Sequence, residues 1–91
     1  MNKPVALITG GTLGIGAATA IALAKDGYDI CLAARNTKDL EVQREIEALN
    51  ARCHLIQADV SQEASCKLVV EETISILGRL DVLVHSAGGQ L

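Results

Sequence analysis

The sequence predicts an α/β fold in which helices cover both faces of a parallel, doubly wound sheet. Short apolar runs alternate with longer segments of helical periodicity, in the order β-α-β-α-β-α-β with short connections. The chain has 91 residues and is 49% apolar, with one Tyr, no Phe and no Trp. Aliphatic strands of this kind are typical of sheets buried on both faces. The length suits one small domain, residues 1–91, and is too short for two.

Charge and hydropathy exclude several classes of function. The net charge is −3 and no basic patch is present, so nucleic acid is not expected as a partner. No charged-then-apolar leader and no apolar run near ~20 residues occur, so we expect no signal peptide, no membrane span and a cytoplasmic location. No metal site is expected either, because neither His54 nor His85 has a cysteine at ligand spacing. Three cysteines are expected to be reduced, buried thiols: Cys31, Cys53 and Cys66.

The first two elements are a strand and a helix. Residues 4–9 (PVALIT) form the continuous apolar run of a strand covered on both faces. From about Gly14 to Asp26 apolar residues recur with helical spacing, and Gly27 stands where a helix ends in the left-handed conformation. The helix face expected to be buried consists of Ile15, Ala18, Thr19, Ala22 and Leu23.

The next strand and helix follow directly. Residues 28–34 (YDICLAA) form the second strand. Residues 37–50 form a helix with Thr37 as its N-cap and acidic residues in its first turns. Its buried positions include Leu40, Ile46 and Leu49.

The alternation then repeats once more. Residues 53–58 (CHLIQA) form the third strand, Ser61 caps a third helix that ends at Gly78, and residues 80–87 (LDVLVHSA) form the fourth strand. The third helix is expected to bury one face made of Cys66, Val69, Val70, Thr73 and Leu77.

Four glycines lie between residues 10 and 16, where the first strand leads into the first helix. At such a junction, backbone N–H groups and the helix dipole form an anion site, and glycines let a pyrophosphate approach the main chain. The spelling G-x-G-x-x-G is not met, because Thr19 stands where the third glycine belongs. The strand–turn–helix context nevertheless favours dinucleotide binding over a glycine-rich turn without a ligand.

Three segments resemble motifs of the short-chain dehydrogenase/reductase family. Residues 9–16 (TGGTLGIG) resemble its TGxxxGIG segment, and residues 58–60 (ADV) are similar to its adenine-contacting motif. Residues 85–88 (HSAG) are similar to its NNAG segment, except that His85 and Ser86 replace two asparagines. This replacement puts any bracing of the neighbouring strands by these side chains in doubt. The resemblance covers the whole chain and implies a Rossmann-type sheet.

The handedness of the connections predicts the strand order 3-2-1-4. Right-handed crossovers put the first two helices on one face of the sheet and the third helix on the other. The fourth strand is then an apolar, unpaired edge, which invites self-association or a homo-oligomer.

The resemblance also implies the cofactor. Ala34 occupies the place of the family's NAD-selecting Asp, and Arg35 takes the next place, which is typical of NADP-preferring members. We therefore expect NADP rather than NAD, and a solvated Arg35 is the alternative. Asp59 is expected to contact adenine, with a carboxylate at a helix start as its alternative. The predicted cofactor-binding residues are Gly10, Thr12, Leu13, Gly14, Ile15, Gly16, Arg35, Asn36, Asp59, Val60, Ala87 and Gly88.

The function implied by the resemblance is hydride transfer between a nicotinamide and a small carbonyl or alcohol substrate. In the family, a Ser and a Tyr-x-x-x-Lys pair beyond the fourth strand perform the catalysis. Tyr28 is followed four places on by Leu32, so no residue is assigned as catalytic and no turnover by these 91 residues alone is expected. A non-catalytic nucleotide-binding module and an interaction piece with a bare sheet edge stay open as alternatives.

Overall fold

A parallel four-stranded sheet forms the centre of the structure, a computed structural model that describes residues 3–10, 14–35, 41–59 and 63–85. Each neighbouring pair of strands is parallel. The predicted doubly wound sheet and its order 3-2-1-4 are therefore confirmed. Across the sheet the strands are β3 (Cys53–Gln57), β2 (Asp29–Ala34), β1 (Val5–Thr9) and β4 (Val82–His85).

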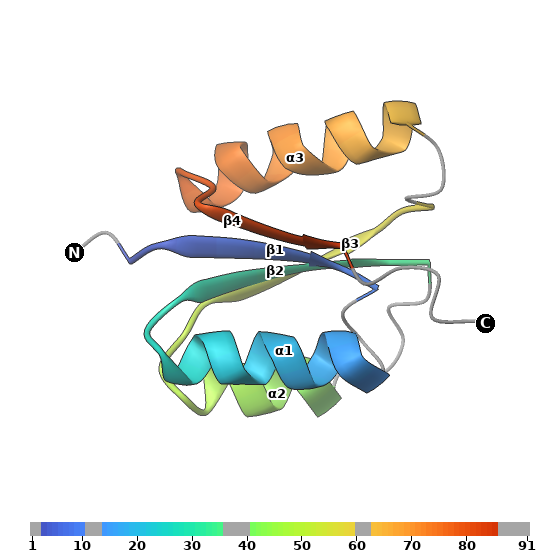
Figure 1. Cartoon of the computed structure of the whole chain (residues 1–91). Coiled ribbons are helices and arrows are strands. Elements are labelled where there is room, and N and C mark those ends of the chain that lie inside the picture. Colours follow the sequence, from blue (N-terminus) through green and yellow to red (C-terminus); the bar gives the residue numbers. More distant parts are fainter. Residues whose placement is uncertain (1–2, 11–13, 36–40, 60–62, 86–91) are drawn as a thin grey trace.

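The helices divide between the two faces as the crossover rule requires. Helices α1 (Gly14–Lys25) and α2 (Glu41–Glu47) cover one face, and α3 (Glu63–Leu77) covers the other (Figure 1). The connections through α1 and α2 step in one direction along the sheet, whereas the connection through α3 returns past β1 to β4. The carboxyl ends of the strands lie at the edge of the sheet where α1 begins (Figure 1).

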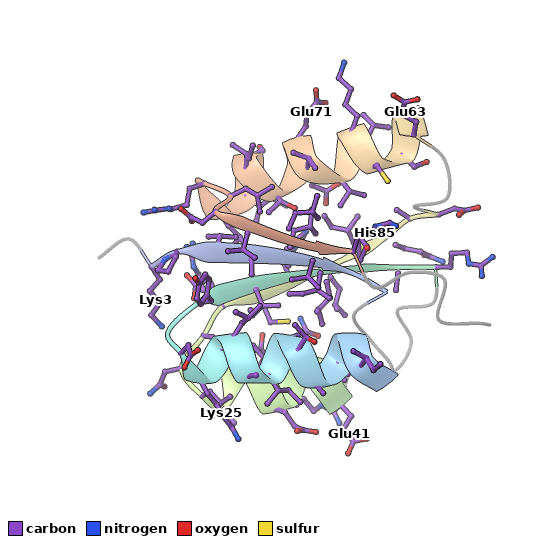
Figure 2. All side chains as sticks on the ribbon, in the orientation of Figure 1. Lys3, Lys25, Glu41, Glu63, Glu71 and His85 are labelled. Carbon is purple, nitrogen blue, oxygen red and sulfur yellow. The ribbon has the colours of Figure 1, made fainter. Side chains whose placement is uncertain are left out.

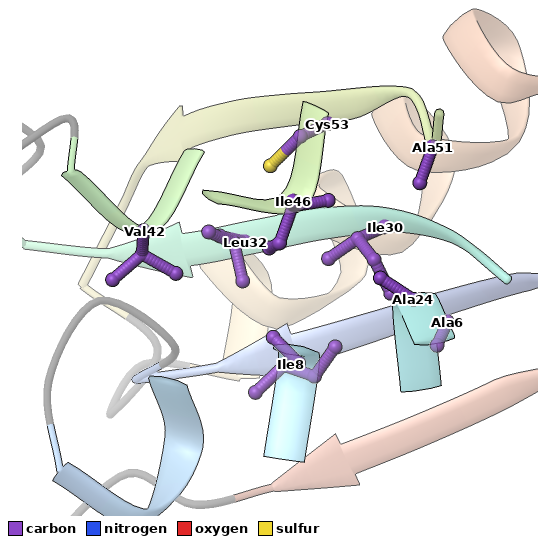
Figure 3. Packing of buried hydrophobic residues seen from close by; sticks show 10 residues of the cluster. Ala6, Ile8, Ala24, Ile30, Leu32, Val42, Ile46, Ala51 and Cys53 are labelled. Carbon is purple, nitrogen blue, oxygen red and sulfur yellow. The ribbon is translucent and has the colours of Figure 1, made fainter. Parts of the chain in front are cut away.

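Two apolar layers fill the space between the sheet and the helices. On the α1 and α2 side, Ile8, Leu32 and Ile46 belong to one buried cluster (Figure 3). On the α3 side, Leu7 and Val69 belong to a second cluster. Strands β1 and β2 are buried at every position, because successive side chains point to opposite faces and both faces are covered.

Helix α1 buries its smallest residues rather than most of the predicted face. Gly16, Ala20 and Ala24 are its buried residues and lie four apart, so they form one stripe. The predicted face was right only in part: Leu23 packs against the core from a half-buried position, but none of the five predicted residues is fully buried. This helix is apolar on most sides, so periodicity alone could not select the side that contacts the sheet. Small side chains allow the closest approach between helix and sheet. The exposed members of the predicted face are Ile15, Ala18 and Ala22.

Helix α2 is shorter than the predicted residues 37–50. It ends at Glu47, and Asn50 has a φ of 67°, so the chain turns away there. For this reason Leu49, expected in the core, is exposed, whereas Val42 and Ile46 are buried. The expected N-caps and one expected core residue lie outside the described residues: Thr37, Ser61 and Leu40.

The structure also bears on the predicted helix ends and thiols. Gly27 and Gly78 end α1 and α3 with φ values of 98° and 90°, as expected.

Burial raises the pKa of Cys31 to about 11, although the Thr73 hydroxyl donates to its sulfur, and burial raises the pKa of Cys53 to about 12. Both groups are therefore neutral thiols near pH 7. The third cysteine is only partly buried: Cys66.

Within the described residues, no group of three or more His, Cys, Asp or Glu side chains is arranged to hold a metal ion. None of the helices in this part of the chain has the length and apolar character needed to cross a membrane.

Candidate functional site

The candidate site begins where the chain leaves the carboxyl end of β1. Gly10 follows β1 with a φ of 72°, and its N–H donates to the Ala33 carbonyl of β2 at 2.6 Å. Helix α1 begins at Gly14, which has a φ of 58°. Residues with a Cβ rarely adopt such angles, so glycine permits the strand-to-helix turn at both positions.

The main chain at the start of α1 is accessible. A Cβ added to Gly14 would meet no described atom within 4 Å. The first four N–H groups of a helix have no acceptor within the helix, and the helix dipole adds about half a positive charge at the same place. These residues therefore fit a phosphate group, which accepts hydrogen bonds and carries negative charge.

The turn follows β1, the strand at which the order of the strands reverses. The chain adds β2 and β3 on one side of β1 and then returns to add β4 on the other side. Strand β1 has β2 on one side and β4 on the other, and the helices that lead to these strands cover opposite faces. In open α/β sheets, ligands bind outside the carboxyl ends of the strands at this reversal. The position of Gly10 and Gly14 thus agrees with a binding site on topological grounds as well as local ones.

A side-chain contact joins β1 to β4 at the same edge. The Thr9 hydroxyl oxygen lies 2.8 Å from Nδ1 of His85, and the two residues are register partners. Either His85 tautomer can form this hydrogen bond, because a hydroxyl both donates and accepts. Figure 2 shows His85 at the end of β4. His85 therefore does brace the neighbouring strand, which the replacement of asparagine had put in doubt.

The predicted residues of β2 and β3 also come to this edge. Arg35 follows β2 and Asp59 follows β3, and both are exposed. The Ala58 N–H donates to the Ala34 carbonyl at 2.9 Å, and Nε2 of Gln57 donates to the Arg35 carbonyl at 3.0 Å. The ends of β2 and β3 are thus held side by side.

The first turn of α1 contains two further predicted residues. Ile15 is 81% exposed, and Gly16 is buried against the sheet. The remaining predicted site residues lie outside the described part of the chain: Thr12, Leu13, Asn36, Val60, Ala87 and Gly88.

A small cavity lies on the other side of the sheet end, beneath α3. Its volume is about 30 Å³ and its lining includes Cys66, Val69, Leu83 and His85. Such a volume can hold about one water molecule, so this cavity is not a dinucleotide site.

An ion pair between the buried Asp29 and the half-exposed Arg52 lies at the opposite ends of the strands. Asp29 is 2% exposed, and its carboxylate accepts hydrogen bonds of 2.8 Å from the N–H and from Nε of Arg52. Lys3 lies 3.9 Å from the same carboxylate. Burial alone would raise the pKa of Asp29, but the hydrogen bonds and positive charge of Arg52, with the charge of Lys3, hold that pKa below its usual value. This cluster stabilises the fold rather than the site, because Lys3 lies at the edge opposite to His85 (Figure 2).

The family assignment follows from comparison with known proteins. The family model for short chain dehydrogenase matches residues 4–91. The chain belongs to the short-chain dehydrogenase family. Among curated relatives, general stress protein 39 of Bacillus subtilis is 43% identical over 92 residues, which cover 99% of this chain and 32% of that protein. A 3-oxoacyl-(acyl-carrier-protein) reductase of Staphylococcus epidermidis is 39% identical and is matched over 97% of this chain and 36% of its own length.

Solved structures of short-chain dehydrogenases superimpose on the same segment. A 3-oxoacyl-(acyl-carrier protein) reductase from Brucella melitensis, in complex with NAD, gives a TM-score of 0.88 at 32% identity and is matched over 97% of this chain and 34% of its own. A short-chain dehydrogenase/reductase from Serratia marcescens gives a TM-score of 0.88 at 31% identity, over 93% and 36%. The chain spans about a third of the length of these relatives.

Proposed function

We propose that this short-chain dehydrogenase segment binds a nicotinamide dinucleotide at the carboxyl edge of β1. The pyrophosphate lies against the first turn of α1. The observation that supports this most strongly is the left-handed Gly14 at the helix start, with its main chain accessible at the reversal of strand order. The NAD complex of the Brucella melitensis reductase, whose fold is similar, supports the same class of ligand.

We further propose NADP(H) as the preferred dinucleotide. Among the described residues, no hydrogen bond or ion pair engages the guanidinium of the exposed Arg35. It is therefore available to a 2′-phosphate, whereas Ala34 offers no carboxylate to a ribose 2′-hydroxyl. We propose that Asp59 contacts the adenine from the end of β3.

In the proposed reaction, the dinucleotide exchanges a hydride with a small carbonyl or alcohol substrate. Residues 1–91 form the NADP-binding part of a Rossmann-type domain, and their task is to bind and orient the dinucleotide. His85 contributes by holding the end of β4 against Thr9, which keeps the two strands beside the site in register. We assign no catalytic acid, base or nucleophile to these residues.

The Gly14→Ala variant is expected to weaken NADPH binding by about tenfold. A residue with a Cβ pays about 1–2 kcal/mol in the left-handed region, so the free variant relaxes and must be strained again when it binds. Titration of the chain with NADPH, followed by the fluorescence of the reduced nicotinamide, measures the change.

Gly27→Ala is the matched control for this variant. Gly27 has a φ of 98°, an added Cβ there also meets no described atom within 4 Å, and it lies at the other end of α1. It should reduce the free energy of unfolding without changing NADPH affinity. Equal affinities for both variants, or no saturable NADPH binding by the unsubstituted chain, contradict the proposed site.

A second proposal concerns association through the edge of the sheet. No described strand pairs with the outer side of β4, and Leu83 on this strand is 55% exposed. An exposed apolar edge strand offers unpaired backbone groups to another chain, and a lysine on it opposes such pairing. We therefore expect self-association that Leu83→Lys reduces and that Leu68→Lys, at an exposed leucine of α3, does not. Sedimentation velocity distinguishes these outcomes, and a monomeric unsubstituted chain contradicts the proposal.

A further inference from the structure

Gln57 extends the connection between β2 and β3 by one residue beyond the sheet. Ala34 and Gln57 are the last register partners of these strands. The next backbone bond runs from the Ala58 N–H to the Ala34 carbonyl, and the following carbonyl, that of Arg35, accepts from the Gln57 side chain at 3.0 Å. The Gln57 side-chain amide thus adds a bond to a carbonyl that the backbone ladder between β2 and β3 does not use.

This bond acts on the residue that the proposed function requires for cofactor choice. Arg35 stands outside β2 and is exposed, so the sheet ladder and the core do not fix its backbone. A long side chain loses up to about 2 kcal/mol of rotamer entropy when it is ordered on a ligand, and an unfixed backbone adds to that cost. A hydrogen bond to the Arg35 carbonyl restricts the rotation of the peptide group that follows the Arg35 Cα atom.

We propose that Gln57 is a positioning residue for the selection of NADP(H) over NAD(H). It acts through Arg35: the amide holds the Arg35 main chain in the orientation from which the guanidinium reaches the 2′-phosphate. The inference rests on the proposed preference for NADP(H). It assigns a specificity role to a residue on β3, the strand next to the one that leads to the arginine.

Gln57→Met tests this role, because methionine is similar in length and has no N–H donor. A neutral hydrogen bond contributes enough to change an affinity by about two- to tenfold. We expect the dissociation constant of NADPH to rise by this factor and that of NADH to stay unchanged. The measured quantity is the ratio of the two constants, which a general loss of stability does not alter.

Gln43→Met is the matched control. Nε2 of Gln43 donates to the Cys53 carbonyl at 3.0 Å, which is the same kind of bond at the opposite end of β3. This variant should lower the midpoint of thermal unfolding and leave the NADPH-to-NADH ratio unchanged. Circular dichroism verifies that both methionine variants are folded.

The same titrations on Arg35→Ala and on the Arg35→Ala/Gln57→Met double variant distinguish the role of Gln57 from the preference for NADP(H). A positioning role requires that Gln57→Met has no further effect on the ratio once Arg35 is alanine. If Arg35→Ala changes the ratio and Gln57→Met does not, the role of Gln57 is overturned and the preference for NADP(H) stands. If Arg35→Ala leaves the ratio unchanged, the proposed preference falls, and the inference falls with it.

Discussion

Arg35→Ala is expected to weaken NADPH binding by about ten- to hundredfold and to leave NADH binding nearly unchanged. A hydrogen bond between charged groups contributes about 1.5–3 kcal/mol, and about 1.4 kcal/mol corresponds to a factor of ten. Only NADPH carries the 2′-phosphate, so only its affinity depends on this contact. Fluorescence titration with each reduced dinucleotide at low ionic strength measures both affinities.

Lys25→Ala controls for the loss of one positive charge in the Arg35 experiment. Lys25 is exposed in the last turn of α1, at the end of the helix away from the site. Its replacement should change the affinity for NADPH and for NADH only slightly, because salt screens a single charge at this distance from the site. Added salt should reduce the difference between the unsubstituted chain and Arg35→Ala, because the contact is exposed. Equal losses of NADPH and NADH affinity would rule out a 2′-phosphate contact by Arg35.

Asp29→Ala is expected to lower the free energy of unfolding by about 2–4 kcal/mol. The variant removes the acceptor of two 2.8 Å hydrogen bonds and leaves the Arg52 N–H, in a partly buried position, without this partner. Losing buried, charge-assisted hydrogen bonds costs this much even when the cation is half exposed, as the Arg52 side chain is. Urea denaturation followed by circular dichroism gives the change.

Two variants make the Asp29 result specific. Asp29→Asn keeps an oxygen for the Arg52 N–H but loses the charge and the acceptor for Arg52 Nε, so its cost should be smaller than that of Asp29→Ala. Asp26→Ala, at an exposed residue three positions earlier, should change stability by no more than about 0.5 kcal/mol. Similar losses for Asp29→Ala and Asp26→Ala would contradict a structural role of the ion pair.

The stabilisation by Asp29 should disappear in acid. Its pKa is held below its usual value in the folded chain, so the folded state binds the proton less readily than the unfolded state does. The contribution is therefore complete above the unfolded pKa, about 3.9, and is lost as the pH falls through the lower folded pKa. The difference in stability between the unsubstituted chain and Asp29→Asn should thus be constant near neutral pH and shrink below about pH 4. Asp81, whose pKa is also lowered, chiefly by the Arg79 side chain, is present in both proteins.

The order of the elements could be predicted from the sequence because each has a local signature. A strand buried on both faces is a continuous apolar run, as at β1, and glycines with positive φ mark the turn before α1 and the ends of α1 and α3. The face of α1 could not be predicted in the same way. Nearly all of its side chains are apolar or small, so its buried stripe depends on what the sheet can accept.

The hydrogen bonds between neighbouring strands could not be predicted from the sequence, for a different reason. The Thr9–His85, Asp29–Arg52 and Gln57–Arg35 hydrogen bonds each depend on which residues stand opposite one another. Register is a property of the assembled sheet, and a shift by one residue would separate every one of these pairs. The candidate cofactor-binding residues rest on motif and family register, and both their assignment and their contacts with a dinucleotide stay a prediction.

The small-residue stripe of α1 has a consequence for how this protein can vary. Gly16 and Ala24 are about 12 Å apart along the helix axis. The buried residues of α1 are Gly16, Ala20 and Ala24, and Ile21 and Leu23 pack against the same cluster from half-buried positions. A methyl group added along the stripe is therefore expected to push the helix away from the sheet, together with the amides of its first turn. At the proposed dinucleotide site, substitution of the buried Ala20 or Ala24 is therefore expected to change ligand affinity through the position of the helix rather than through direct contact.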